Sequence, residues 1–70
     1  MTDQDWRKQA TKEQRDKVKY HIKQWGVHWS DCNILIGCLG LPSDWVSLAI
    51  PKGEGRWFVC GIDPEGNTSS

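Results

Sequence analysis

The sequence predicts a small α+β domain in which one N-terminal helix packs on a three-stranded antiparallel β-meander. Three observations predict this class: a helical spacing of apolar residues early in the chain, a two-residue spacing later, and a glycine-rich turn between two apolar runs. We expect one domain over residues 1–70, with a helix at about 12–25, strands at about 33–39, 45–51 and 56–62, and residues 1–9 and 67–70 as candidates for flexibility.

The helix has a start signal, an apolar stripe and a stop signal. Thr11-Lys12-Glu13-Gln14 has the threonine-to-glutamine spacing of a capping box. Val18, Ile22 and Trp25 then recur at i, i+4 and i+7, which places them on one face of a helix. Gly26 follows as the residue expected to end it.

The hairpin is predicted from alternation around a turn. Val46, Leu48 and Ile50 alternate with smaller or polar residues, and Lys52–Gly55 is a turn by composition. We expect three cross-strand pairs on the face that the helix covers: Ile50 with Trp57, Leu48 with Val59, and Val46 with Gly61. A slip of one residue would exchange the two faces.

The other face of this hairpin is also largely apolar. It would carry Trp45, Ala49, Phe58, Cys60 and Ile62. Large apolar patches on small domains usually mark contacts with other proteins. The sequence therefore predicts a non-enzymatic protein-binding module that binds another protein or a second copy of itself. The residues expected to contact the partner are Trp29, Trp45, Phe58 and Ile62.

Five tryptophans in 70 residues can help to fill the core of a small domain. We expect Trp25 and Trp57 in the core, because they lie on the two faces assigned inward. Trp29, Trp45 and Phe58 are expected either in a second small cluster or in an exposed patch.

Charge is divided between the two parts of the chain. Residues 1–25 hold seven Lys or Arg and four Asp or Glu, a net charge of +3. Residues 26–70 hold two Lys or Arg and five Asp or Glu, a net charge of −3. The basic side chains are interleaved with acids, so nucleic-acid binding is possible but not favoured. The expected role of the basic residues is a solvated helix face.

The odd number of cysteines and the polar N-terminal stretch indicate a protein of a reducing compartment. Cys32, Cys38 and Cys60 are odd in number, and the N-terminal stretch is polar and charged, so we expect no signal peptide, free thiols and a cytoplasmic location. No apolar run approaches the ~18 residues that a membrane span needs.

No cofactor, metal or catalytic site is predicted. His21, His28 and the three cysteines do not match the ligand spacing of a structural zinc site. His28, Asp31 and Cys32 could form a thiol site only if the fold oriented them, and no motif does so.

An alternative comes from the pattern Leu35-x-x-x-Leu39-Gly40-Leu41-x-x-x-x-Val46-x-x-Ala49. Over residues 17–66 the chain resembles the Cro-type helix-turn-helix repressors. This resemblance implies a DNA-binding transcriptional repressor whose recognition positions are Ser43, Asp44, Ser47 and Leu48. We prefer the meander because none of these positions is basic and because the hairpin gives strand 56–62 a partner within the chain.

In length and style the chain also looks like the short orphan proteins of tailed-phage genomes. Many of those proteins inhibit or redirect a host protein. The resemblance implies an accessory or host-inhibitor role and assigns no residue.

Overall fold

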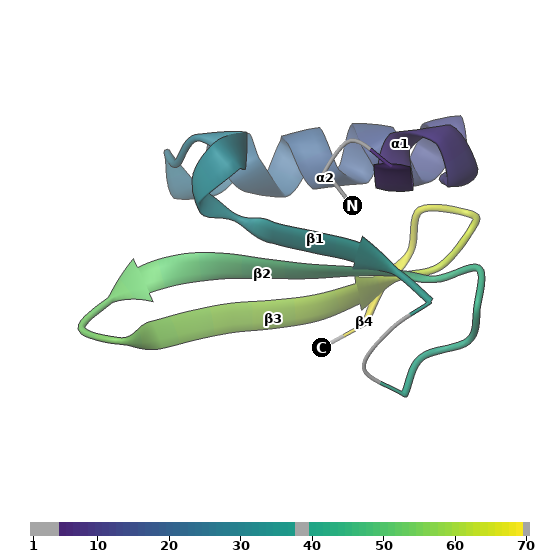
Figure 1. Cartoon of the computed structure of the whole chain (residues 1–70). Helices are drawn as coiled ribbons and strands as arrows, with labels where there is room; N and C mark the ends of the chain where they lie inside the picture. Colours follow the sequence, from purple (N-terminus) through teal and green to yellow (C-terminus); the bar gives the residue numbers. More distant parts are fainter. Residues whose placement is uncertain (1–4, 38–39, 70) are drawn as a thin grey trace.

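The computed structural model of the chain describes residues 5–37 and 40–69. One layer of helices covers one face of an antiparallel sheet with the strand order β1-β2-β3-β4 (Figure 1). The elements are α1 (Asp5–Gln9), α2 (Lys12–Trp25), a 3₁₀ turn η1 (Trp29–Asp31), β1 (Asn33–Ile36), β2 (Val46–Gly53), β3 (Arg56–Ile62) and β4 (Thr68–Ser69). The expected α+β class is confirmed, and β4 adds a short fourth strand to the meander.

Helix α2 has the predicted bounds and the predicted caps. The Gln14 side chain accepts a hydrogen bond from the Thr11 backbone N–H at 2.8 Å, and the Gln14 backbone N–H donates to Thr11 Oγ1 at 3.1 Å. At the other end Gly26 has a φ of 67°, and its N–H donates to the carbonyls of Ile22 and Lys23. Both caps satisfy backbone groups that a helix end would otherwise leave unpaired.

Gln14 also joins α2 to the sheet. Its side chain is 1% exposed, and Nε2 donates to the carbonyl oxygens of Asp44 at 2.7 Å and Ile62 at 3.1 Å. One buried amide therefore caps the helix and holds it against the ends of two strand segments.

The hairpin register differs by one residue from the predicted register. The turn consists of Glu54 and Gly55 alone, with φ of 56° and 74°, the positive values that a two-residue type I′ turn requires. Gly53 pairs with Arg56, and an irregularity between Pro51 and Gly53 leaves Lys52 as an extra residue on β2. We call this feature the Lys52 bulge.

The Lys52 bulge exchanges the faces of β3. Ile50 pairs with Phe58, Leu48 with Cys60 and Val46 with Ile62, and this set points toward α2. The prediction that Trp57 and Val59 lie on the inner face is therefore wrong. They point away from the helix and are 51% and 48% exposed.

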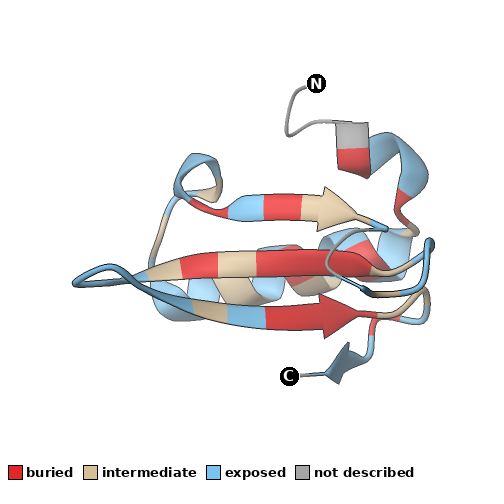
Figure 2. Cartoon of the chain, turned by 60° about the horizontal axis from the view of Figure 1, so that its bottom comes forward, coloured by how far each residue is buried: buried red, intermediate tan, exposed pale blue. Residues whose placement is uncertain are grey.

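The core lies between α2 and the inner sheet face. Figure 2 shows buried residues gathered in β2 and in the C-terminal half of β3. The buried apolar residues are Trp6, Ala10, Val18, Cys32, Ile34, Val46, Leu48, Ile50, Cys60 and Ile62.

The core contains a different tryptophan at the helix side from the one expected. Trp25 was expected in the core but is 40% exposed at the end of α2, where its ring lies 5.3 Å from the ring of Phe58 between centroids. Trp6 of α1 is instead a core residue at 4% exposure. The short first helix thus closes one end of the core.

The two helices that the helix-turn-helix alternative requires are not formed by the described residues. Leu35 lies in β1, and Val46 and Ala49 lie in β2, while Gly40 and Leu41 belong to the connection between these strands. The strand expected at 33–39 ends at Ile36, because Gly37 turns the chain with a φ of 71°. Cys38 and Leu39 lie outside the described residues.

The C-terminal segment docks on α2. Thr11 Oγ1 donates to the Pro64 carbonyl at 2.6 Å, and His21 Nε2 lies 3.0 Å from Thr68 Oγ1. Between these contacts, a Cβ added at Gly66 would lie 3.1 Å from both Cβ and the carbonyl oxygen of Glu13, so the turn packs closely on the helix. These contacts hold β4 beside β3.

Candidate functional site

Among residues 5–37 and 40–69, the segment that covers the sheet face turned away from α2 lies at one end of that face. A Cβ added at Gly61 would lie 3.2 Å from Leu41 Cδ1 and 3.2 Å from Trp45 Cε3, so these two side chains lie directly over the strand. Ser47, the cross-strand partner of Gly61, is buried beneath the same segment. Trp45, which is half-buried, therefore packs over the outer face at this end of the sheet.

On β2 and β3 the rest of this face is apolar and partly exposed, and exposed Asn33 of β1 borders it as the cross-strand partner of Ala49. Trp57 pairs with Pro51 and Val59 pairs with Ala49, so the four side chains lie on one face of two neighbouring strands. Trp57 and Val59 are about half exposed, and Pro51 and Ala49 are partly buried. We call Ala49, Pro51, Trp57 and Val59 the outer patch.

The outer patch lies beside an open sheet edge. β3 pairs with β2 along most of its length, but on its other side only Gly61 and Ile62 pair with β4 (Figure 1). Among residues 5–37 and 40–69, no strand pairs with the outer edge of Arg56–Cys60. Backbone donors and acceptors on such an edge are available to a strand from another chain.

The four residues predicted to bind a partner do not form one surface. Ile62 is 0% exposed in the core, and Phe58 is half-buried on the inner face beneath Trp25. Their assignment to the outer face is wrong for the same reason as the register. Trp45 does lie on the outer face, whereas Trp29 lies in η1, on the helix side of the molecule.

The two cysteines that the structure describes lack the surroundings of a reactive thiol. Cys32 and Cys60 are free and buried, and burial raises the pKa of each thiol above its ordinary value. The His28 imidazole is turned toward Ser30, with Nδ1 2.7 Å from Oγ, while the Cys32 thiol faces the His28 carbonyl at 3.6 Å. His28 and Cys32 therefore do not form an ion pair that would activate the thiol.

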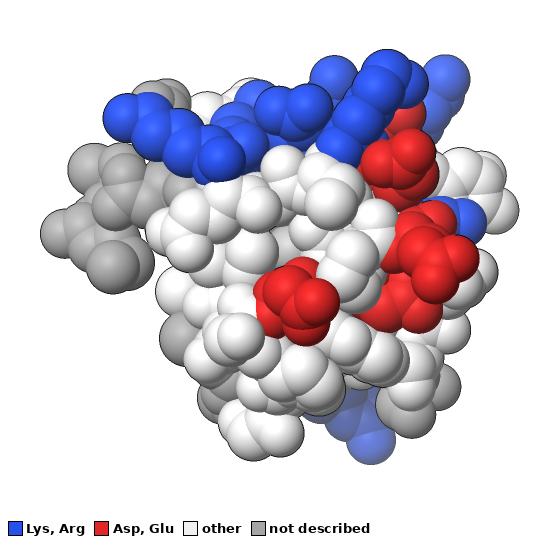
Figure 3. All heavy atoms as spheres, turned by 90° about the vertical axis from the view of Figure 1, so that its right-hand side faces the viewer, with Lys and Arg blue, Asp and Glu red and all other residues white. Residues whose placement is uncertain are grey.

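The charged residues are unevenly distributed over the surface. In Figure 3 most Lys and Arg side chains lie along the top of the molecule and the Asp and Glu side chains lie below them, with further basic side chains at the right and at the bottom. In the described part of the chain, no group of three or more His, Cys, Asp or Glu is arranged to hold a metal ion. No helix within 5–37 or 40–69 combines the length and hydropathy of a membrane span.

No protein-family model, curated protein or solved structure matches the chain. The likeness to short tailed-phage proteins therefore stays a prediction.

Proposed function

We propose that the chain is a non-enzymatic protein-binding module whose partner adds an extended segment to the open edge of β3. The observation that carries this proposal is the exposure of Trp57 and Val59 beside that edge. Main-chain hydrogen bonds supply affinity in this mode of recognition, and alternate side chains of the added strand supply specificity.

The sequence of the edge favours such pairing. Natural edge strands are often protected by charged side chains, by proline or by a bulge in the edge strand itself. Within Arg56–Cys60 the only charged residue is Arg56 at the start, and the Lys52 bulge lies on the inner strand β2. The edge between Trp57 and Cys60 therefore carries none of these protections.

Trp57 is the expected anchor of the interface. A tryptophan can bury roughly 150–250 Å², and half of this side chain remains exposed. Covering roughly 100 Å² of it would contribute about 2.5 kcal/mol at 25 cal/mol per Å². Tryptophan is also enriched among the residues that dominate binding energy.

The proposal places the module in the cytoplasm. Support comes from the two described cysteines, which are free thiols, as is usual for proteins of a reducing compartment. The likeness to tailed-phage accessory proteins makes a host protein the first partner to test.

The test compares two Lys substitutions at exposed residues. Val59→Lys places a charge in the outer patch, and Tyr20→Lys places the same charge on α2, where Tyr20 is 54% exposed. Parent, Val59→Lys and Tyr20→Lys chains serve as bait in host lysate, and each protein recovered is purified and titrated against all three. We expect Val59→Lys alone to lose the partner, and the partner to slow amide hydrogen exchange in Arg56–Cys60.

The proposal is wrong if folded Val59→Lys binds the purified partner as tightly as the parent does. Sedimentation of the parent over a range of concentrations shows whether the partner is a second copy. In that case Val59→Lys would sediment as a monomer at concentrations where Tyr20→Lys self-associates.

A further inference from the structure

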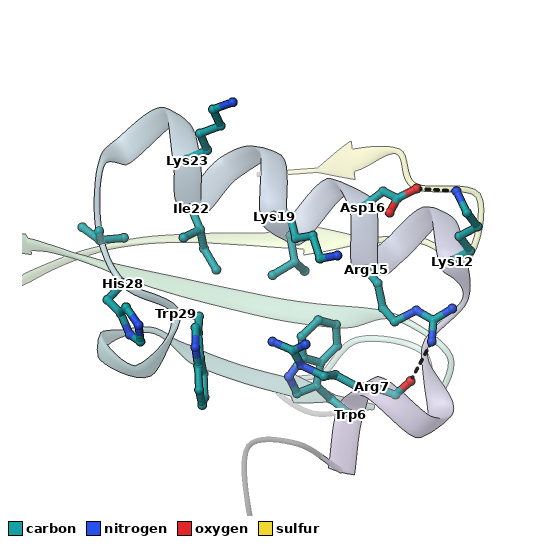
Figure 4. A pocket seen from close by; sticks show the side chains of 12 residues that line it. Trp6, Arg7, Lys12, Arg15, Asp16, Lys19, Ile22, Lys23, His28 and Trp29 are labelled. Carbon is teal, nitrogen blue, oxygen red and sulfur yellow. Dashed lines mark hydrogen bonds and ion pairs between the residues drawn. The ribbon is translucent and has the colours of Figure 1, made fainter.

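A groove of about 620 Å³ lies on the helix side of the molecule, between α2 and the segments α1 and η1 (Figure 4). Buried Trp6 and Val18 and half-buried Ile22 and Val27 form its apolar floor. The polar and aromatic residues around this floor are Arg7, Lys12, Arg15, Asp16, Lys19, Lys23, His28 and Trp29. The groove is separate from the outer patch, which lies across the sheet.

The lining of the groove is strongly cationic. It includes five Lys or Arg and one Asp, a net charge of +4. The one carboxylate, that of Asp16, is paired with Lys12 at 2.9 Å. Among residues 6–37 and 40–69, no ion pair joins Arg7, Arg15 or Lys19 to a carboxylate, although Asp16 is near enough to Lys19 and Arg15 for both to lower its pKa slightly.

The basic residues on α2 form a row. Arg15, Lys19 and Lys23 are four residues apart, so they recur at intervals of about 6 Å along the helix. In Figure 4 the Arg15 and Lys19 side chains lie along the groove, and Lys23 points away at its far end. Arg7 faces this row from α1, and Arg15 Nη1 donates to the Arg7 carbonyl at 3.4 Å.

Planar side chains line the side of the groove opposite this row. The Arg7 guanidinium lies 5.5 Å from the ring centroid of Trp6 and 5.6 Å from that of Trp29. The Trp29 ring in turn lies 5.6 Å from the His28 ring, with an angle of 34° between the planes. The groove thus places an aromatic ring and a guanidinium plane opposite a row of cations.

We propose that this groove binds a short single strand of nucleic acid. Single-strand sites combine a cationic groove for the backbone with aromatic or guanidinium planes on which bases stack. Arg15 and Lys19 would contact phosphates, and Trp29 with Arg7 would contact bases. A peptide of Asp and Glu could satisfy the cations equally well, but these side chains have no rings that could stack on Trp29.

The probe is a fluorescently labelled 12-nucleotide oligo(dT), and its binding to the full chain is measured by fluorescence anisotropy at several salt concentrations. Two phosphate contacts, to Arg15 and Lys19, predict a slope of about −1.4 for log K against log salt concentration. This slope corresponds to roughly 7-fold weaker binding at 200 mM than at 50 mM salt. Each lost contact should reduce the slope by about 0.7.

Four variants separate the phosphate contacts from stacking. Lys19→Ala should make the slope shallower, whereas Lys17→Ala should leave it unchanged, because Lys17 lies on α2 outside the groove. Trp29→Ala should weaken binding roughly 5- to 150-fold at every salt concentration, the range measured for loss of one base stack. Trp29→Phe should recover part of this loss, which a folding defect alone would not explain.

The proposal is overturned by any of three results. One is the absence of salt-dependent binding to oligo(dT). A second is an equal effect of Lys17→Ala and Lys19→Ala, which would indicate diffuse attraction to the helix. The third combines two observations: poly-glutamate binds as tightly as oligo(dT), and folded Trp29→Ala binds oligo(dT) as tightly as the parent does. Together they would indicate a site for an acidic peptide. Val59→Lys should bind oligo(dT) normally, because the outer patch is elsewhere.

Discussion

Replacing Gln14 by Glu tests whether one buried amide holds the helix to the sheet. The substitution keeps the size of the side chain and changes the Nε2 donor into an oxygen. The two carbonyl oxygens that Nε2 contacts, those of Asp44 and Ile62, would then face a third oxygen in a site where the side chain is 1% exposed. The acceptor that serves the Thr11 N–H would remain.

The expected loss is large for a domain of this size. A buried carbonyl left without its donor costs about 1–3 kcal/mol; the bond to Ile62 is buried and the bond to Asp44 is part-buried, so losing both suggests about 3 kcal/mol. A 70-residue domain is stable by about 4–10 kcal/mol in total. At about 4–8 °C for each kcal/mol, the Tm should fall by about 12–24 °C.

The loss should also depend on pH. Burial against carbonyl oxygens disfavours the charged form, so the folded-state pKa of the introduced carboxyl should lie above its unfolded value of about 4.3. The destabilisation is then smallest below that value and grows as the pH rises through the folded-state pKa.

Urea unfolding at pH 4 and pH 7 measures the effect, with Glu13→Gln as the matched control. Glu13 is an exposed neighbour on the same helix, and its replacement should change the free energy of unfolding by less than about 0.5 kcal/mol. If Gln14→Glu at pH 7 stays within that same margin of the parent, with an unchanged m-value, the role assigned to Gln14 is wrong.

Three further predictions concern other contacts of α2 and of the C-terminal turn. Gly26→Ala should cost about 1 kcal/mol in thermal unfolding, because the φ of 67° is unfavourable for alanine although no atom lies within 4 Å of the added Cβ. Burial, with a smaller effect of Lys17, lowers the pKa of His21, so stability should fall as the pH drops below about 6.5, and His21→Gln should remove this dependence in urea titrations. The backbone N–H of Asn67 is the main cause that lowers the pKa of Asp63, so acid titration should show stability declining below about pH 4, and less steeply in Asp63→Asn.

The helix could be predicted from the sequence because its determinants are local. Thr11, Gln14 and Gly26 lie within a few residues of the backbone groups that they cap, and Val18 recurs one turn after Gln14 on the buried face. The role of Gln14 in the capping box could be predicted from its spacing from Thr11. Its contacts with Asp44 and Ile62 could not be predicted, because they join residues 30 and 48 positions apart.

The strands could be located from the sequence, but their register could not. Lys52, Gly53, Glu54 and Gly55 can form a four-residue loop, or a bulge followed by a two-residue turn, and these choices differ by one residue in the pairing of β3 with β2. Both sides of β3 carry apolar residues, so the pattern did not decide between them. A Glu-Gly pair preceded by glycine was the one local signal of the shorter turn.

The groove on the helix side was missed for a different reason. Arg7, Lys19 and Trp29 come from three separate segments, and each has an ordinary explanation when taken alone. Only the packing of α1 and η1 beside α2 brings them together.

The Lys52 bulge has a consequence for how this surface could change in evolution. Deleting one codon in the hairpin would move β3 by one position and exchange the side chains facing the helix with those facing outward. Trp57 and Val59 would then meet the core, and Phe58 and Ile62 would meet the solvent, without any substitution. Because both sets are apolar, a single insertion or deletion could give one lineage a different binding surface on the same backbone architecture.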